Sequence, residues 1–369
     1  MKKPKNLKKG DKIAIVSLSL GILGEKYCKH ELDIAIKRLK EMGLVPIIMN
    51  NSLKGVEYLK NHPEERAEDL KQAFLDPSIK AIITAMGGDD TYKTIPYLME
   101  DLEFIEAVKK NPKIFIGFSD TTHNHLMLNK LGLSTFYGPS LLTDIAELDN
   151  EMLPYTKKYF EKLFINEDSF EIESSPIWYS DRNSYDPDQI GIPRTTNEEV
   201  HGYETINGNG IVTGLLFGGC LESIYDAMIG NSNEKAPYIY KKYDLFPQEE
   251  EWHEKILFLE TSELKINPTE LEKMLIELKN RNILKLVKGV IVGKPIDEVY
   301  YEEYKDIFKK VFANLNTPVL YNVNFGHSYP RSIIPYDAEA TIDYDNKRIF
   351  INNRILDYNE NINKKRKIK

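Results

Sequence analysis

The first 165 residues alternate short apolar runs with stretches of helical periodicity, and this alternation limits the chain to a small set of folds. Each run has the length of a buried strand, and the runs lie at 13–16, 45–49, 81–84 and 113–116. Helical patterns lie between them, such as Glu31 to Met42, which ends at Gly43. Repeated strand-then-helix order predicts an α/β fold with a doubly wound parallel sheet, in which functional groups collect at the carboxyl ends of strands.

The length of 369 residues suggests two domains, since one domain has about 150 residues. The strand–helix rhythm stops near residue 166, and residues 166–204 are polar and rich in turns. A second set of elements then begins, with a predicted helix at Pro268–Asn280 and a hairpin signal at Asp345-Asn346. We therefore predict an N-terminal domain (1–165), a linker or mobile loop (166–204) and a smaller C-terminal α/β domain (205–369).

Charge, hydropathy and cysteine content exclude several classes of protein. The formal net charge of −8 argues against a nucleic-acid binder, which needs a basic face. No stretch approaches the about 18 apolar residues of a membrane span, and no apolar region follows the basic N-terminus. Cys28 and Cys220 lie far apart and do not suggest a disulfide framework, so we expect a cytoplasmic protein. The basic run 364–367 is expected to be a solvated chain end.

Ser119 is the first candidate for chemistry, because it lies between an apolar run and a helical stretch from Thr121 to Leu131. A strand–turn–helix junction presents a side chain at the upper edge of a sheet, as in a nucleophile elbow. The usual pattern G-x-S-x-G lacks its last glycine here, since Thr121 stands in that place. A serine that caps the helix starting at Asp120 is the alternative, and the local sequence alone favours it.

A serine nucleophile needs a base, and the base needs an orienting acid. His327 follows a strand-like run that ends near Val323, and Glu260 directly follows the apolar run 256–259. Glu263 competes for the role of the acid three residues later, in a more exposed position. The structural alternatives are a surface-loop histidine and loop or helix-capping acids.

An oxyanion hole needs amide groups aimed at one point. Gly87-Gly88 allows close backbone approach, so we predict that the Gly88 amide supplies one donor and the Asp120 amide the other. A double glycine between a strand and a helix can also bind phosphate. The chain, however, lacks both the Gly-Lys-Ser/Thr ending of a P-loop and the G-x-G-x-x-G pattern, so no cofactor is predicted.

Three further features offer alternatives. Cys220 follows a Gly-Gly pair at a predicted helix start, where a thiolate is favoured, although such a cysteine is more often a small packing residue. His123 and His125 are two residues apart on a helix and face away from each other, so no metal site is predicted. Trp178 lies in the polar central segment, where its ring either stacks on a ligand or anchors the loop to the core.

Together these motifs resemble a known family, the serine carboxypeptidases that include murein LD-carboxypeptidases and microcin C self-immunity proteins. The resemblance spans most of the chain and rests on the ordered segments Met86-Gly87-Gly88-Asp89-Asp90, Gly117-Phe118-Ser119-Asp120, Gly218-Gly219-Cys220-Leu221, Leu259-Glu260 and Gly326-His327. It implies a flavodoxin-like N-terminal sheet, related to glutamine-amidotransferase domains, that carries Ser119 toward Glu260 and His327 of a C-terminal domain. It also implies a homodimer that cleaves an amide bond next to a free carboxylate without a metal.

Within the family, the chain is more similar to the microcin-immunity branch. Murein-type members tend to have Arg before the Gly-Gly pair and Tyr after it, where this chain has Met86 and Asp89. The long central loop with Trp178 fits the branch in which an aromatic ring stacks on a nucleobase. The family often has Asn where Cys220 stands.

These roles predict a serine carboxypeptidase in which His327 takes the proton of Ser119 while Glu260 holds the imidazole ring. The substrates that fit are a peptidyl- or aminoacyl-nucleotide amide, a murein tetrapeptide and a cytoplasmic peptide. Two other functions stay open, a cysteine amidohydrolase that uses Cys220 and a non-catalytic module that binds a small ligand. The serine peptidase is preferred because only this function uses Ser119, Glu260 and His327 together.

Overall fold

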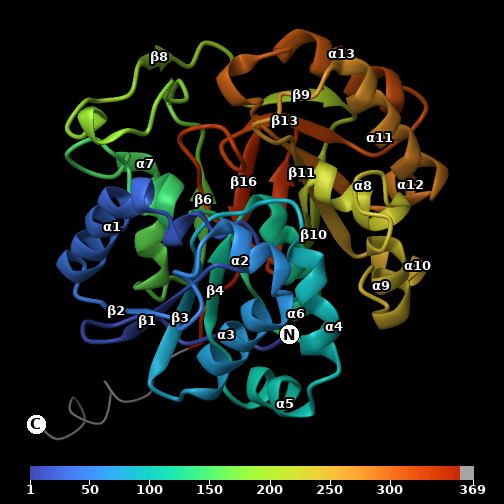
Figure 1. Ribbon diagram of the computed structural model, residues 1–369. Helices are drawn as coiled ribbons and strands as arrows, with labels where there is room; N and C mark the ends of the chain where they lie inside the picture. The colour runs from blue at the N-terminus through green and yellow to red at the C-terminus, as the bar shows by residue number, and fades with distance from the viewer. Residues whose placement is uncertain (358–369) are drawn as a thin grey trace, which may run out of the picture.

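Two large β-sheets with helices packed around them make up most of the protein (Figure 1), and the computed structural model describes residues 1–357. The first sheet and its helices form the lower part of the view, and most of the second sheet lies above it. The basic run 364–367 lies outside the described residues. Among residues 1–357, no helix combines the length and the apolar character that a bilayer crossing requires.

The first sheet has the strand order β2-β1-β3-β4-β5-β14. Its strands are β1 (Lys12–Val16), β2 (Val45–Ile48), β3 (Ile79–Thr84), β4 (Ile114–Gly117), β5 (Phe136–Tyr137) and β14 (Ile334–Pro335). All neighbours pair in parallel except β14, which pairs antiparallel with β5. The order 2-1-3-4-5 is that of a flavodoxin-like sheet. The predicted doubly wound parallel sheet is therefore confirmed, and β14 is an addition from the far end of the chain.

The second sheet has the order β6-β16-β15-β10-β11-β12-β13-β9. Its strands are β6 (Phe170–Ile172), β9 (Glu204–Asn207), β10 (Ile211–Cys220), β11 (Lys255–Glu260), β12 (Gly289–Gly293), β13 (Val319–Val323), β15 (Glu339–Asp343) and β16 (Arg348–Ile351). The four central strands β10 to β13 are parallel, and the outer strands pair antiparallel. β15 and β16 form the hairpin predicted from Asp345-Asn346. The protein is thus a mixed α/β protein, as predicted.

The helices include the one predicted at Pro268–Asn280, which has those bounds in the structure. It begins after Asn267, whose side chain accepts a hydrogen bond from the Glu270 amide, and it buries Leu271, Leu275 and Leu278 against the core. The α-helices are α1 (Lys29–Glu41), α2 (Val56–Asn61), α3 (Pro63–Leu75), α4 (Ile95–Met99), α5 (Leu102–Lys110), α6 (Thr122–Lys130), α7 (Pro154–Phe160), α8 (Leu221–Ile229), α9 (Ala236–Tyr243), α10 (Glu249–Trp252), α11 (Pro268–Asn280), α12 (Ile283–Leu286) and α13 (Tyr301–Phe312). Shorter turns are η1 (Ile22–Gly24), η2 (Lys26–Cys28), η3 (Thr91–Thr94), η4 (Ser119–Thr121), η5 (Leu141–Ile145), η6 (Glu161–Leu163), η7 (Pro187–Gln189) and η8 (Ile296–Glu298).

The central segment 166–204 has more structure than the expected linker or mobile loop. Its first strand, β6, joins the second sheet, while β7 (Ile177–Tyr179) and β8 (Thr196–Glu198) form a separate antiparallel hairpin. Two arginines of the segment, Arg182 and Arg194, bind the buried Glu147 carboxylate at 2.5 and 2.6 Å. Sequence polarity suggested exposure, but here the charged groups pair with one another in the interior.

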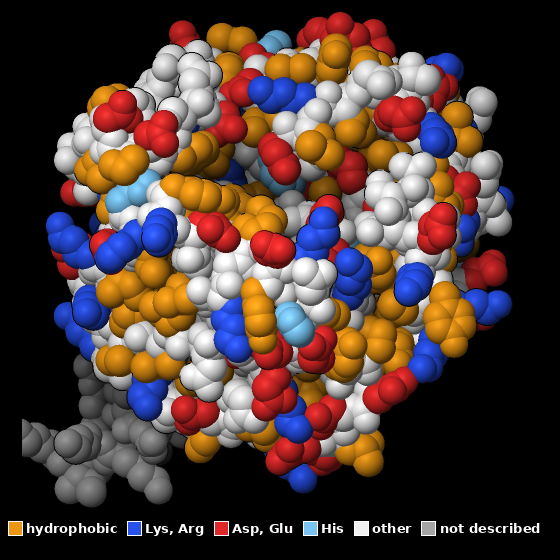
Figure 2. All heavy atoms as spheres, in the orientation of Figure 1, with side chains coloured by type: hydrophobic (Ala, Val, Ile, Leu, Met, Phe, Trp, Pro, Cys, Tyr) orange, Lys and Arg blue, Asp and Glu red, His pale blue; other side chains and the backbone are white. Residues whose placement is uncertain are grey.

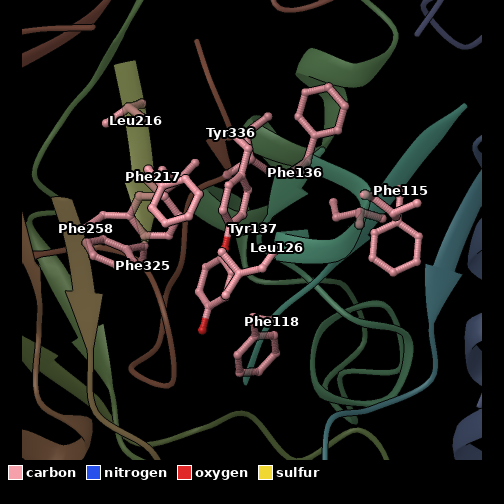
Figure 3. Packing of buried hydrophobic residues seen from close by; sticks show 14 of the residues in the cluster. Phe115, Phe118, Leu126, Phe136, Tyr137, Leu216, Phe217, Phe258, Phe325 and Tyr336 are labelled. Carbon is pink, nitrogen blue, oxygen red and sulfur yellow. The ribbon is translucent and has the colours of Figure 1, made fainter. Parts of the chain in front are cut away.

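Aromatic rings fill the space between the two sheets (Figure 3). Tyr137 and Tyr336 stand between Phe217 and Phe258 of the second sheet and Phe115 of the first. The ring centroids of Tyr137 and Tyr336 lie 5.5 and 5.1 Å from that of Phe258. Such pairs contribute about 0.5–1.5 kcal/mol each beyond their burial. This packing fixes the relative position of the sheet edges at which the candidate residues lie.

Candidate active site

Ser119 lies in a tight turn directly after β4. Its φ is +65°, which is unusual for a residue with a side chain. Gly87 packs against the turn, because a Cβ added there would lie only 2.8 Å from the Ser119 Cβ. The Ser119 side chain does not cap a helix, since neither η4 nor α6 has a side-chain capping bond. The elbow hypothesis therefore fits this turn, and the capping alternative is wrong.

Ser119, His327 and Glu260 form one continuous chain of hydrogen bonds. The Ser119 Oγ lies 3.0 Å from His327 Nε2, and His327 Nδ1 lies 2.7 Å from Glu260 Oε2. The same carboxylate oxygen accepts a bond from the His327 backbone amide at 3.1 Å. Glu260 is the last residue of β11 and its side chain is 1% exposed. The structure thus brings together three residues that are far apart in the sequence.

Close backbone packing around Glu260 explains why glycine precedes the histidine. Gly326 has a φ of +83°, and a Cβ there would lie 2.4 Å from the Glu260 Cγ. A Cβ on Gly293, at the end of β12, would lie 2.7 Å from the Glu260 Cβ. Any side chain at these two positions would push the carboxylate away from the imidazole ring.

Tyr137 is a site residue that the sequence analysis missed. Its hydroxyl accepts a bond from the Ser119 amide at 3.0 Å and donates one to Glu260 Oε1 at 2.5 Å. Both Glu260 oxygens are therefore occupied, one by the histidine and one by the tyrosine. Burial raises the pKa of Tyr137 well above its usual range, so it stays a neutral donor. A Tyr in a two-residue strand carries no local signal for such a role.

The charges around His327 favour its protonated form. Burial disfavours the imidazolium, but the carboxylates of Glu260 and Glu263 outweigh burial and raise the pKa of His327 to about 10. Glu263 Oε2 lies 2.9 Å from Nε2, and the pKa of Glu263 is lowered mainly by its hydrogen bond to His327. The sequence left open which of the two acids contacts His327. In the structure both do, Glu260 at Nδ1 and Glu263 at Nε2.

The backbone segments of the predicted oxyanion hole lie next to each other. A Cβ on Gly87 would lie 3.2 Å from the Asp120 amide nitrogen, and Gly88 has a φ of +154°. The Asp120 side chain points away from this role, since its carboxylate accepts bonds from Ser19 Oγ at 2.7 Å and from the Thr91 amide at 2.8 Å. Burial opposes the charge, but bonds led by that to His123 lower the pKa of Asp120 to about 2. The hydrogen bonds of the Asp120 carboxylate thus hold the turn at Ser119 in place.

A cavity of about 350 Å³ opens over Ser119 and His327. Figure 2 shows a hollow on this face with a histidine side chain at its floor and acidic and apolar side chains around it. Four of the lining side chains are acidic, namely Glu31, Asp181, Asp186 and Glu263. Four are aromatic, namely Tyr27, Phe118, Tyr185 and Tyr329. Arg331 is the one Lys or Arg side chain that lines the cavity within residues 1–357.

Family models match both halves of the chain. Residues 13–138 match the LD-carboxypeptidase N-terminal domain, and residues 213–342 match the LD-carboxypeptidase C-terminal domain. The chain belongs to the LD-carboxypeptidase family. The predicted resemblance is thus confirmed, as is the prediction that the protein is a hydrolase of peptide bonds.

Relatives from both branches of this family match most of the chain. The crystal structure of an MccF-like protein from Streptococcus pneumoniae in complex with AMP is 44% identical, with a TM-score of 0.88, and the match covers 95% of this chain and 100% of that one. The probable murein peptide carboxypeptidase of Bacillus subtilis is 27% identical over 95% of this chain and 94% of its own. The microcin C7 self-immunity protein MccF of Escherichia coli is 26% identical over 79% of both chains.

Trp178 does not reach the cavity. It lies in β7, is 9% exposed and is absent from the lining residues. The ammonium group of Lys294 lies 5.2 Å from the centroid of its ring. Two roles were predicted for Trp178, stacking on a ligand and anchoring the loop. The structure favours the loop anchor, because the ring is buried and already contacts the Lys294 ammonium group.

Cys220 and the two helical histidines also lie outside the site. The Cys220 thiol contacts the Glu222 carboxylate at 3.3 Å, and burial together with that charge raises its pKa well above the usual range. It is therefore a neutral packing residue instead of an activated thiolate. His123 bonds the Tyr240 hydroxyl at 2.6 Å, whereas His125 bonds Thr135 Oγ1 at 2.7 Å. The two imidazole rings thus hydrogen-bond to different parts of the protein, which agrees with the prediction that they point in different directions.

Proposed function

We propose that this protein is a serine carboxypeptidase that uses Ser119 as nucleophile, His327 as base and Glu260 as orienting acid. It hydrolyses an amide bond next to a free carboxylate in an aminoacyl- or peptidyl-nucleotide. The observation that carries the proposal is the unbroken chain from Ser119 Oγ through both ring nitrogens of His327 to Glu260 at the floor of a cavity.

The reaction proceeds through an acyl-enzyme. Neutral His327 Nε2 takes the Ser119 proton as Oγ forms a bond to the amide carbon, and the amides of Gly88 and Asp120 stabilise the oxyanion. The carbon–nitrogen bond then breaks while Nε2–H protonates the leaving nitrogen. A water molecule gives its proton to Nε2, attacks the acyl carbon and releases Ser119 with its proton restored. Glu260 stays ionised and stabilises the imidazolium at both steps.

The shape and chemistry of the cavity support a nucleotide-like substrate. The Streptococcus pneumoniae relative has AMP bound. The exposed phenol ring of Tyr27 lines the cavity and is the surface on which a nucleobase stacks in this proposal. Arg331, which also contacts the buried Asp144 carboxylate at 3.4 Å, is the cation that we assign to the free carboxylate of the substrate. Trp178, first considered for stacking, has no part in this proposal.

A murein tetrapeptide is the second candidate substrate, supported by the Bacillus subtilis relative named as a murein peptide carboxypeptidase. Purified protein is incubated separately with aspartyl sulfamoyl adenosine and with murein tetrapeptide, and the products are identified by mass spectrometry. We expect release of aspartate from the first compound and little or no D-alanine from the second. The reverse pattern would assign the protein to murein.

The Ser119→Ala variant tests the mechanism in the same assay. It should lose activity by several orders of magnitude while its unfolding temperature stays close to that of the wild type. Full activity of this variant would reject the proposal. Cys220→Ser is the matched control, and it should keep its activity, whereas a cysteine amidohydrolase would lose it. Tight ligand binding without turnover would indicate the non-catalytic alternative.

The proposal includes a cytoplasmic homodimer. Both cysteines are buried as free thiols, which suits a reducing compartment. Light scattering coupled to size-exclusion chromatography should give twice the mass of 42.7 kDa.

A further inference from the structure

His327 Nε2 faces two oxygen atoms, although the proposed mechanism assigns it only one. The Ser119 Oγ lies at 3.0 Å and the Glu263 Oε2 at 2.9 Å. On the other side of the ring, Nδ1 is held by Glu260 at 2.7 Å. Each ring nitrogen of this histidine is therefore in contact with a carboxylate.

Two carboxylate contacts define the protonation state of the ring. An ionised carboxylate is an acceptor only, so both Nδ1 and Nε2 must carry hydrogens. An imidazolium has no lone pair at Nε2 with which to take the proton of Ser119. The raised pKa of His327 agrees with this state. Other groups near the ring do not remove this proton. Tyr137 is neutral, and the Arg331 guanidinium donates from Nη2 to the His327 carbonyl oxygen at 3.1 Å instead of contacting the ring.

Glu263 is attached in a way that lets its carboxylate leave. It lies in the loop 261–267 between β11 and α11, and the loop itself is fixed at Ser262, whose amide and hydroxyl bind Glu222 Oε1 at 2.8 and 2.7 Å. A second anchor is the contact of Lys265 Nζ with Asp297 Oδ2 at 2.8 Å. The Glu263 side chain is 59% exposed, against 1% for Glu260. Rotation about its own bonds can therefore remove the carboxylate without moving the loop.

We propose that Glu263 is a positioning residue that holds His327 in its protonated form while the cavity is empty, and that the leaving-group nitrogen of the substrate takes its place. This inference rests on the proposed function. During acylation, Nε2–H must be given to the leaving nitrogen, and Glu263 Oε2 occupies a hydrogen-bonding position on that same atom. The empty enzyme thus keeps its base inactive, and occupancy of the cavity frees it.

The first test measures how fast diisopropyl fluorophosphate modifies Ser119 as a function of pH, with release of fluoride. This small probe leaves the leaving-group position next to Glu263 unfilled. In the Glu263→Gln variant, the pH midpoint of the rate should move down by at least one unit, so the rate at pH 7 should rise about tenfold. Asp186→Asn removes a carboxylate that lines the same cavity without touching His327, and it should leave the midpoint in place. An unchanged midpoint in Glu263→Gln would overturn the inference.

The second test observes the histidine directly and needs no turnover. Nitrogen-15 NMR of His327 in the unmodified protein should show both ring nitrogens protonated at pH 7, and Glu263→Gln should lower the pH at which one proton is lost. An unprotonated Nε2 in the wild type at pH 7 would reject the role of Glu263 and leave the proposed function standing. If Ser119 reacts in neither protein, the proposed function fails, while the NMR titration still decides the role of Glu263.

Discussion

At the scale of single residues, Tyr137 connects the proposed nucleophile to the proposed acid through one hydroxyl group. It accepts a hydrogen bond from the Ser119 amide and donates one to the Glu260 carboxylate, which stabilises the negative charge of that carboxylate. In the proposed mechanism Glu260 holds an imidazolium that forms and disappears, and a neutral donor at its second oxygen keeps the orientation of the carboxylate constant. The geometry of the turn and the position of the acid are thus set by the same side chain.

Tyr137→Phe should lower kcat/KM by about tenfold or more, because hydrogen bonds to charged groups contribute about 1.5–3 kcal/mol. The ring remains, so its packing against Phe258 should be retained. Steady-state kinetics on the substrate that the wild type hydrolyses measures the loss, and circular dichroism checks the fold. Unchanged kinetics would show that the tyrosine has only a packing role.

The raised pKa of His327 makes the stability of the fold depend on pH. The folded-state pKa is about 10 against an ordinary value of 6.5. The folded protein therefore binds a proton more tightly than the unfolded chain, and this stabilisation is complete below pH 6.5 and lost as the pH rises to about 10. Urea unfolding should show that His327→Gln loses more stability, relative to wild type, at pH 6 than at pH 9.5. An equal loss at both pH values would contradict the pKa shift.

At the scale of elements, the central segment is held by a buried ionic cluster. Glu147, which is 1% exposed, binds Arg182 and Arg194, and the Arg194 guanidinium lies 3.8 Å from the ring centroid of Tyr329. The arginines outweigh the effect of burial and lower the pKa of Glu147. Since Asp181 and Tyr185 of the same segment line the cavity, the cluster fixes one wall of the site.

Glu147→Gln should cost about 3–5 kcal/mol of unfolding free energy, because it removes the carboxylate that two buried arginines share and leaves Arg194 only its 3.2 Å ion pair with Asp181. Urea unfolding measures this loss, and hydrogen exchange should show faster exchange in residues 180–194. The control is Glu173→Gln, which removes a carboxylate from an exposed pair with Lys158 and should change stability by less than about 1 kcal/mol. Equal effects of the two substitutions would contradict a structural role for the cluster.

Local patterns predicted the long elements but not those that depend on distant pairing. The helix at Pro268–Asn280 carries its own cap and apolar face, and the buried strands β1, β3 and β4 are continuous apolar runs, so each could be identified from its own residues. The two-residue strands β5 and β14 exist only through pairing with distant segments, β5 with both β4 and β14, and β14 with β5. For the same reason Ser119, Glu260 and His327 could be found by their places after strands, whereas Tyr137 could not. The choice between the two roles of Trp178 also needed the structure, because a polar sequence does not reveal that the charged neighbours of Trp178 pair internally.

At the scale of the whole molecule, the first sheet is completed by a strand from the other end of the chain. β14 (Ile334–Pro335) covers the edge of β5, and Tyr336 follows it into the aromatic layer between the sheets. The first sheet therefore has a protected edge only in the full-length chain.

A fragment of residues 1–165 should self-associate, since it lacks β14 and exposes both the edge of β5 and the aromatic face. Light scattering at micromolar concentration should show fragment species larger than a dimer, whereas the full chain under the same conditions should not exceed the proposed dimer. A stable monomeric fragment would show that the first sheet folds independently of the C-terminal part.

The late position of His327 and β14 in the chain also has a consequence for protein synthesis in the cell. Ser119 leaves the ribosome early in synthesis. The imidazole of His327 and the strand β14, which covers the edge of β5, are added only near the end of the chain. The proposed nucleophile is therefore inert throughout most of translation. An interrupted copy that ends before residue 327 lacks the imidazole, so its serine has no base.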